Sequence, residues 1–366
     1  MTRQKFLRQA AAALTTAGRA EAQREQGWRM PDESAPHKRT WMAFGAQEKV
    51  WGKRLHRRVQ ADLALIARTI ARFEPVHMLV GTDSHAAAQR HLNGAANISL
   101  VEAELDDLWV RDSGPSFVVN QAGRLGGVDL NFNGWGRKQV HARDAEVAAH
   151  ICEIAGAEHL ETELVGEGGG IEIDGHGLAI MTESCFLNDN RNPGLRKQDC
   201  EEILRAFLGI QRVVWLPGMR GQDITDGHTD FYARFARPGV VIAGLERDSE
   251  SPDYNVTREH LKVLRAARDR AGRPLEIITL ESPAKTRREF AGEEFAAGYI
   301  NFYVCNGAVI VPEFGDAAAD THCQTVLARL FPKRTIVPLN IDGIAAGGGG
   351  IHCATQQEPR ATAITL

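Results

Sequence analysis

The sequence predicts an α/β fold assembled from repeated helix–strand units, most simply a ring-shaped α/β propeller. Five segments with apolar residues three and four positions apart, typical of amphipathic helices, are each followed by a short β-branched run, typical of a strand. These pairs recur at roughly 50–75 residues, a spacing that indicates supersecondary units closed into a ring. An open α/β sheet would show a similar spacing, and the pattern alone does not decide between the two arrangements.

The elements can be placed in order along the chain. In the first unit the apolar residues from Leu55 to Ile70 predict a helix over residues 53–73, and a strand follows over residues 76–80. The later helix–strand pairs are expected over residues 144–155 and 162–165, 196–208 and 213–216, 257–271 and 275–280, and 317–331 and 335–338. Residues 301–304 and 308–312 are two apolar runs joined by Asn306 and Gly307, which is typical of a β-hairpin.

The length requires either two domains or one domain built from repeats. The chain has 366 residues, of which 43% are hydrophobic and 25% charged, an ordinary globular composition. One core seldom grows beyond about 250–300 residues, so a chain of this length needs more than a single simple core. Because no linker rich in Pro, Gly and Ser divides the repeats, we expect one α/β-propeller domain over residues 27–366 and a tail over residues 1–26.

Charge and hydropathy exclude several classes of partner. Lys and Arg together number 43 against 47 Asp and Glu, with a net charge of −4 and no long block of one sign. This is not the basic surface of a nucleic-acid-binding protein, and a small cationic ligand suits it better. No apolar run approaches the ~18–20 residues of a membrane span, so we expect no membrane partner. Association into a homo-oligomer is left open.

The cysteines indicate a reducing compartment. Six cysteines are scattered without C-x-x-C pairs, which argues against a disulfide scaffold or a zinc ribbon. We therefore expect a cytoplasmic protein. The segment from Thr2 to Leu14 resembles a degenerate twin-arginine export signal in which Gln4 replaces the second arginine, so a periplasmic location is the alternative.

The first candidate site residue is Cys353. Four glycines, Gly347 to Gly350, stand just before it, and glycines at this density suit a loop wrapped around a ligand. A buried packing cysteine is the ordinary alternative. Gln356 and Gln357 follow closely and make that alternative weaker, because polar amides are unusual neighbours for a core cysteine.

A second group of candidates surrounds His228. In an extended segment, residues two apart point to the same face, so His228 can share a face with Asp226 and Asp230. This pattern indicates acid/base or ligand chemistry. A solvated acidic turn and a metal site are the alternatives, and the metal site is less favoured because no run such as H-E-x-x-H supplies further ligands.

Two further segments carry charged residues beside turns. Trp109 and Asp112 flank a probable strand that ends at a Gly-Pro turn, where Asp112 is the better functional candidate and Arg111 suits a structural ion pair equally well. Glu167 precedes three glycines, and Glu183 follows a strand over residues 178–181. Either glutamate could orient a histidine, and the sequence does not decide between them.

Together these segments closely resemble the agmatine deiminase family, relatives of the bacterial peptidylarginine deiminases within the guanidino-group-modifying superfamily. The shared motifs, in order, are GWRMPDESAPHKRTWMAFG, WVRDSGPSFVV, FNGWG, EGGG with TESCFLNDNRNPG, TDGHTD, NFYVCNGAVIVPEFGD and GGGGIHCATQQEP. They run from about Gly27 to Pro359. The entry stretch from Lys38 to Gly45 departs from the commoner family pattern, which leaves recognition of the substrate's far end undetermined.

The resemblance implies a five-bladed α/β propeller of the pentein type and hydrolysis of agmatine to N-carbamoylputrescine and ammonia, with no metal or organic cofactor. It implies a covalent amidino-cysteine on Cys353, with His228 as general acid/base and Glu183 as first choice for steadying His228. The residues expected to line the substrate are Asp112, Asp230, Trp109, Asn301, Glu167 and Asp226. Glu167 is also the second choice for orienting His228.

Three alternatives stay open on the sequence. The same chemistry could act on peptidyl or free arginine, or an amidinotransferase could pass the amidino group to an amine. A metal-dependent hydrolase built on Asp226, His228 and Asp230 is a different class. Because carboxylates disfavour a nearby thiolate, we also expect that substrate binding assists ionisation of Cys353.

Overall fold

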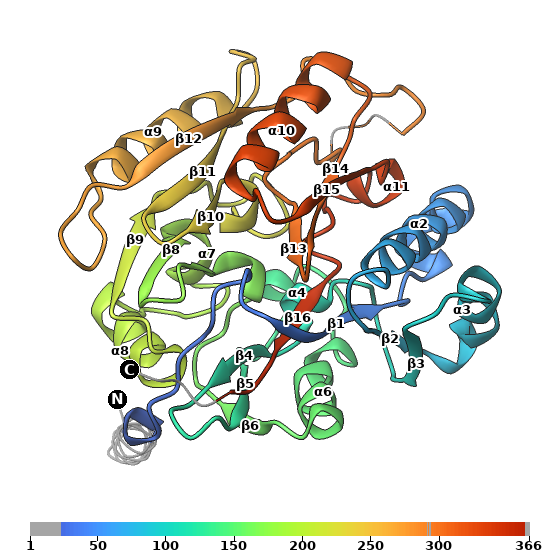
Figure 1. Ribbon diagram of the computed structural model, residues 1–366, viewed down its shortest axis with the longest axis horizontal. Helices are drawn as coiled ribbons and strands as arrows, with labels where there is room; N and C mark the ends of the chain where they lie inside the picture. Colours follow the sequence, from blue (N-terminus) through green and yellow to red (C-terminus); the bar gives the residue numbers. More distant parts are fainter. Residues whose placement is uncertain (1–22, 291, 293, 363–366) are drawn as a thin grey trace, which may run out of the picture.

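Five small β-sheets are arranged in a ring with the long helices at its outer edge (Figure 1). The computed structural model describes residues 23–290, 292 and 294–362. The export-signal-like segment lies outside the described residues, and the division into a tail and one domain stays a prediction. Within the described part of the chain, no helix has the length and apolar character that a membrane span needs.

Four of the five units share one topology. Two antiparallel strands come first, a helix follows, and a third strand then pairs parallel to the second. In chain order these units are β4 (Ser116–Val119), β5 (Leu125–Asp129), α6 (Val147–Ala155) and β6 (Glu158–Glu161); β7 (Glu172–Ile173), β8 (Leu178–Thr182), α8 (Lys197–Leu208) and β9 (Arg212–Leu216); β10 (Ala233–Arg237), β11 (Val240–Leu245), α9 (Asp253–Ala266) and β12 (Glu276–Glu281); and β13 (Tyr303–Cys305), β14 (Ala308–Pro312), α10 (Ala317–Leu330) and β15 (Thr335–Leu339).

The remaining unit closes the ring. Its first strand is β16 (Gln356–Pro359), which pairs antiparallel with β1 (His37–Ala43) from the other end of the described chain. β2 (Val76–Val80) then pairs parallel to β1, after α2 (Glu48–Ile70). An extra helix and strand, α3 (His85–Leu92) and β3 (Ile98–Glu102), extend this sheet to four strands. The closed ring confirms the propeller expectation, and the open-sheet alternative is wrong.

Several predicted boundaries differ from the structure, among them the helix expected over residues 257–271, which is α9 (Asp253–Ala266), and two of the differences have clear local reasons. Helix α2 starts at Glu48, before the predicted position, because a first turn precedes Gly52, whose φ of 66° interrupts the helical geometry. Strand β6 lies just before the predicted segment 162–165. Gly156 ends α6 in the left-handed conformation, so the chain reverses at once and the residues immediately after it pair with β5.

The segments that enter the first strand of each unit meet at the centre of the ring. The residue that each unit brings there stands just before its first strand: Cys353 before β16, Asp112 before β4, Gly169 before β7, His228 before β10 and Asn301 before β13. Apolar residues fill the clusters between sheets and helices, whereas these central residues are buried and mostly polar. The ring therefore assembles one polar site from five distant segments.

Candidate active site

The glycine segment holds Cys353 against Trp109 and Asn301. A side chain at Gly349 would place its Cβ 2.1 Å from the Trp109 ring, and one at Gly350 would place its Cβ 2.3 Å from Asn301 Oδ1. Only glycine allows these approaches, and a loop wrapped around a ligand stays a prediction. Trp109 is itself fixed, because its indole N–H donates to the carboxylate of Asp107 at 3.1 Å.

The thiol of Cys353 is buried beside one amide and one carboxylate. Asn301 Nδ2 donates to Cys353 Sγ at 3.3 Å, and Asp230 Oδ2 lies 3.7 Å from the same sulfur. Burial, followed by the negative charges of Asp230 and Asp112, raises the pKa of the Cys353 thiol well above its usual value of 9.0. Without a bound cation, the thiol form is therefore favoured.

His228 lies between two carboxylates. Its Nε2 is 3.4 Å from Glu167 Oε2, and its Nδ1 is 3.7 Å from Asp112 Oδ1. Burial alone would lower the pKa of His228, but the negative charge of Asp112 and the hydrogen bonds that the protonated ring donates to Cys185 and Glu167 hold the pKa well above 6.5. The ring is thus kept protonated and able to give a proton to a leaving group.

Glu167, not Glu183, is the glutamate beside His228. Glu183 is half-exposed and pairs with Lys197 on the surface, Oε1 lying 2.6 Å from Nζ. Glu167 is fully buried, and Arg191 Nε lies 2.8 Å from its Oε1. Burial would raise the pKa of Glu167, but Arg191 lowers it below its usual value. The first choice of Glu183 is wrong because its side chain leaves the strand end toward solvent.

Asp112 and Asp230 face each other across a glycine. Trp135 Nε1 donates to Asp112 Oδ2 at 2.9 Å, and the Gly169 N–H donates to its Oδ1 at 3.1 Å. A Cβ on Gly169 would lie 2.6 Å from His228 Nδ1, 2.9 Å from Asp112 Oδ1 and 3.2 Å from Asp230 Oδ2. These three groups therefore surround one point, and any side chain at Gly169 would occupy it.

The two carboxylate oxygens of Asp230 differ in their hydrogen bonding. Its Oδ2 is 2.7 Å from His352 Nδ1, whereas its Oδ1 is buried and has no hydrogen-bond partner within the described residues. A buried carboxylate oxygen without a partner is costly, so a donor is expected there when the site is occupied. A planar guanidinium, which carries several N–H groups, is a donor of the right kind.

Asp226 does not line the site. Its Oδ2 accepts hydrogen bonds from Lys138 and Arg191, each at 2.8 Å, and its Oδ1 accepts one from the Gly221 N–H. These bonds use both oxygens and direct the carboxylate away from Cys353. Placing Asp226 on the substrate is therefore wrong, and the metal set of Asp226, His228 and Asp230 does not converge.

Sequence reasoning missed a buried ion network behind Asp230. His352 lies between two carboxylates, its Nδ1 2.7 Å from Asp230 and its Nε2 2.7 Å from Glu33. Glu33 also pairs with Arg234 at 2.8 Å and with Arg111 at 3.3 Å. Burial would raise the pKa of Glu33, but these cations hold it well below 4.5.

The sequence hinted at this network only through where His352 and Glu33 stand relative to the candidate nucleophile and the shared motifs. His352 directly precedes the candidate nucleophile, and Glu33 falls in the first shared motif. Their separation along the chain, 319 residues, hides the contact from any local pattern. Arg111, which the sequence allowed as either structural or functional, takes the structural place.

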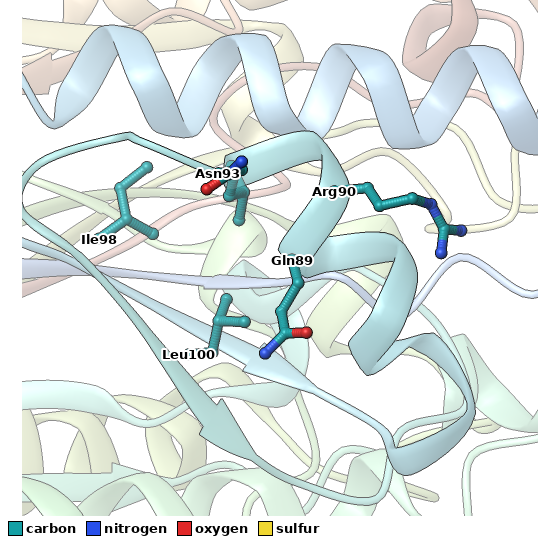
Figure 2. Close-up of a pocket in the computed structure, with 6 residues that line it drawn as sticks. Gln89, Arg90, Asn93, Ile98 and Leu100 are labelled. Atoms are coloured by element: carbon teal, nitrogen blue, oxygen red, sulfur yellow. The ribbon is translucent and has the colours of Figure 1, made fainter.

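A surface hollow lies elsewhere and has a different character. It has a volume of about 440 Å³ and lies between α3 and β3 at the outer edge of the first unit (Figure 2). Its lining consists of Gln89, Arg90, Leu92, Asn93, Ile98 and Leu100. It brings together no nucleophile and no acid/base pair, so the chemistry is assigned to the ring centre.

Comparison with known proteins identifies the family. Residues 29–359 match the family model described as Porphyromonas-type peptidyl-arginine deiminase. The agmatine deiminases of Stutzerimonas stutzeri and Pseudomonas putida are each 39% identical, over 92% of this chain and 96% of theirs. The solved structure of the agmatine deiminase of Enterococcus faecalis has a TM-score of 0.86 at 33% identity, covering 92% of this chain and 97% of that one. The chain therefore belongs to the agmatine deiminase family, within the Porphyromonas-type peptidyl-arginine deiminases.

Proposed function

We propose that this protein hydrolyses agmatine to N-carbamoylputrescine and ammonia through a covalent intermediate on Cys353. The observation that carries the proposal is the buried arrangement of Cys353, His228, Asp112 and Asp230 around Gly169, with one oxygen of Asp230 unpaired. Two carboxylates can hold a guanidinium by its N–H groups and place its carbon beside the sulfur of Cys353.

Binding of the cation prepares the nucleophile. A positive charge at ~4 Å from the sulfur contributes roughly 4 kcal/mol at an effective dielectric near 20, which favours the thiolate of Cys353. The thiol releases its proton to solvent, and the thiolate attacks the guanidinium carbon to form a tetrahedral adduct. His228 then gives its proton to the departing nitrogen, which leaves as ammonia, and an amidino-cysteine remains.

The second half of the reaction returns the enzyme to its starting state. His228, now neutral, takes a proton from water, and the hydroxide adds to the amidino carbon. Collapse of this second adduct breaks the carbon–sulfur bond, the departing sulfur takes up the hydroxyl proton, and N-carbamoylputrescine is released. The thiol of Cys353 and the protonated His228 are restored.

The buried arginines favour agmatine over arginine as substrate. An arginine substrate would bring a carboxylate that needs a cationic partner. Arg111 and Arg234 near the site already pair with Glu33, and Arg191 already pairs with Glu167 and Asp226. A cytoplasmic location and the oligomeric state stay predictions from the sequence.

The direct test is substrate turnover. Purified protein is incubated with agmatine, free arginine and a blocked arginine peptide, and ammonia and ureido product are measured. We expect turnover of agmatine alone, abolished in Cys353→Ala and retained in Cys152→Ala, a matched buried cysteine on α6. Turnover of the peptide instead would move the assignment to peptidylarginine, and an amidino group captured by added amines would indicate a transferase.

The ionisation of Cys353 can be tested separately. Alkylation of the empty enzyme is followed against pH, with Cys353→Ala to identify the labelled residue. We expect the apparent pKa to lie above the ordinary value of 9.0, because burial and two carboxylates oppose the thiolate. A thiol that ionises well below about 8.5 without ligand would contradict substrate assistance.

A further inference from the structure

A second thiol lies beside the proposed acid/base and has no part in the reaction. Cys185 is fully buried on α7 (Glu183–Phe186), and its Sγ is 3.4 Å from Glu167 Oε2. The same carboxylate oxygen is 3.4 Å from His228 Nε2. One donor atom from each of these three residues lies within 4.8 Å of the others, the one such group that converges among the described residues.

The spacing of the donors suits a tetrahedral cation. Zinc bonds of about 2.0–2.1 Å to nitrogen, 2.0–2.2 Å to oxygen and 2.3 Å to sulfur require neighbouring donors to be roughly 3.3–3.7 Å apart. The separations of Cys185 Sγ and of His228 Nε2 from Glu167 Oε2, each 3.4 Å, meet this requirement. A thiolate, an imidazole and a carboxylate form a set that favours thiophilic ions over Mg²⁺ or Ca²⁺.

The surrounding residues support the ligands as an outer shell would. The second ring nitrogen of His228 faces Asp112 at 3.7 Å, the carboxylate–histidine arrangement found behind metal-bound imidazoles. Arg191 holds Glu167 by both oxygens, at 2.8 Å and 3.0 Å, and so fixes the carboxylate. Its positive charge opposes a cation. The two anionic ligands, Glu167 and a Cys185 thiolate, offset that repulsion.

We propose that Glu167, Cys185 and His228 form an inhibitory site for a thiophilic divalent cation such as Zn²⁺. Binding releases the thiol proton of Cys185 and any proton on His228 Nε2 to solvent. The bound ion occupies Nε2, so the ring can release a proton from Nδ1, the nitrogen beside Asp112 and Gly169, only by becoming an imidazolate, and proton transfer to the leaving group is blocked. The binding site is independent of the proposed substrate, and only its inhibitory effect rests on the proposed function.

Binding is tested without turnover, in the Cys353→Ala background, where the nucleophile cannot contribute a thiolate. Cd²⁺ is titrated in, and the cadmium–thiolate absorption in the ultraviolet is recorded. We expect a saturable signal of one ion per chain, lost on adding Cys185→Ala and kept on adding Cys152→Ala. Loss in both double variants, survival in both, or no saturable signal in the Cys353→Ala parent would overturn the site.

Inhibition is then measured on the enzyme with Cys353 intact. Zn²⁺ is added to the wild type and to Cys185→Ser, and each rate is divided by that variant's own rate without metal. We expect the inhibitory concentration to rise at least about tenfold in Cys185→Ser, since a hydroxyl is a poor ligand for zinc, and chelation to restore the wild-type rate. Equal inhibition of both proteins would place the ion on Cys353 and overturn the proposal.

Discussion

Asp112 and Asp230, the two carboxylates beside Gly169, are both buried but differ in the residues that contact them. Behind Asp230 is His352, which in turn contacts Glu33 and, through it, two arginines. Among the described residues, Asp112 accepts hydrogen bonds from the indole N–H of Trp135 and the backbone N–H of Gly169, and His228 lies beside it. Burial raises the pKa of Asp112 above its usual value, whereas His352 outweighs burial and lowers the pKa of Asp230.

The difference teaches that the two carboxylates have separate duties. Asp230 is held ionised by its own network before any substrate arrives, so it can attract the cation. Asp112 depends on a positive charge supplied by His228 or by the substrate itself. In the proposed reaction, Asp230 therefore carries its negative charge before the cation binds, and the cation stabilises the negative charge of Asp112.

The largest loss of kcat/KM is expected from a substitution at Gly169, which lies between Asp112 and Asp230. Gly169→Ala would place a Cβ within 2.6–3.2 Å of His228, Asp112 and Asp230, so all three must move. Because misplacement by about 1 Å can cost 100-fold, we expect kcat/KM to fall by at least about 100-fold. The control is Gly81→Ala, whose Cβ meets only an ordinary contact at 3.6 Å. Near-normal activity of Gly169→Ala would show that the groups do not surround the substrate point.

A smaller loss of kcat/KM is expected from a substitution at His352, which contacts Asp230 and not Asp112. His352→Gln removes the imidazole that contacts both Asp230 and Glu33, and hydrogen bonds to charged groups contribute about 1.5–3 kcal/mol, which corresponds to roughly 10- to 100-fold in kcat/KM. We expect a raised KM, because Asp230 loses the support that keeps it ready for the cation. Steady-state kinetics measure it. A purely structural role would lower the melting temperature and leave the KM of the folded fraction unchanged.

A substitution beside His228 should change the pH profile of kcat/KM. Glu167→Gln removes a negative charge that helps to hold the pKa of His228 well above 6.5. Activity that needs protonated His228 is lost as pH rises through that pKa, so the alkaline limb should move to lower pH while the acid side stays. The profile of kcat/KM measures this shift. An unmoved alkaline limb, in a protein whose melting curve stays cooperative, would separate Glu167 from the control of His228.

The smallest effect is expected at Glu183. Its surface pair with Lys197 is half-exposed, and such pairs contribute about 0–1 kcal/mol to stability. Glu183→Gln should leave kcat/KM within about twofold and the pH profile unchanged. Measured beside Glu167→Gln, it is the matched control for removing one carboxylate charge. A large loss here would restore Glu183 as a partner of His228.

Local pattern was enough to predict the repeating units and the hairpin from β13 to β14. It also singled out Cys353, His228, Asp112 and Asp230, which the structure brings together, whereas Asn301 came from the resemblance alone. Helical periodicity and β-branched runs are properties of neighbouring residues, and the repeat of five made the ring the simplest arrangement. The resemblance to a family added the roles. The extra pair α3 and β3 was missed because it repeats the helix–strand pattern within a unit already counted.

Pairings between distant segments were out of reach. Glu167 and Glu183 both stand beside turns, and only the path of the surrounding strands directs one inward and the other toward Lys197. Asp226 alternates with His228 in sequence, but its φ of 61° turns the chain and breaks the strand-like alternation on which the prediction rested. The contact between His352 and Glu33 arises only when the ring closes.

The strand that fastens the ring is also the strand that follows the nucleophile. β16 joins β1 across more than three hundred residues of chain, and Cys353 stands just before it. Opening this seam would withdraw the sulfur from Asn301 and Asp230 at the same moment as it freed the ends of the ring. The half-life of activity on heating should therefore follow the rate at which β16 separates from β1. Thermal inactivation would then be governed by the kinetics of that one strand pair.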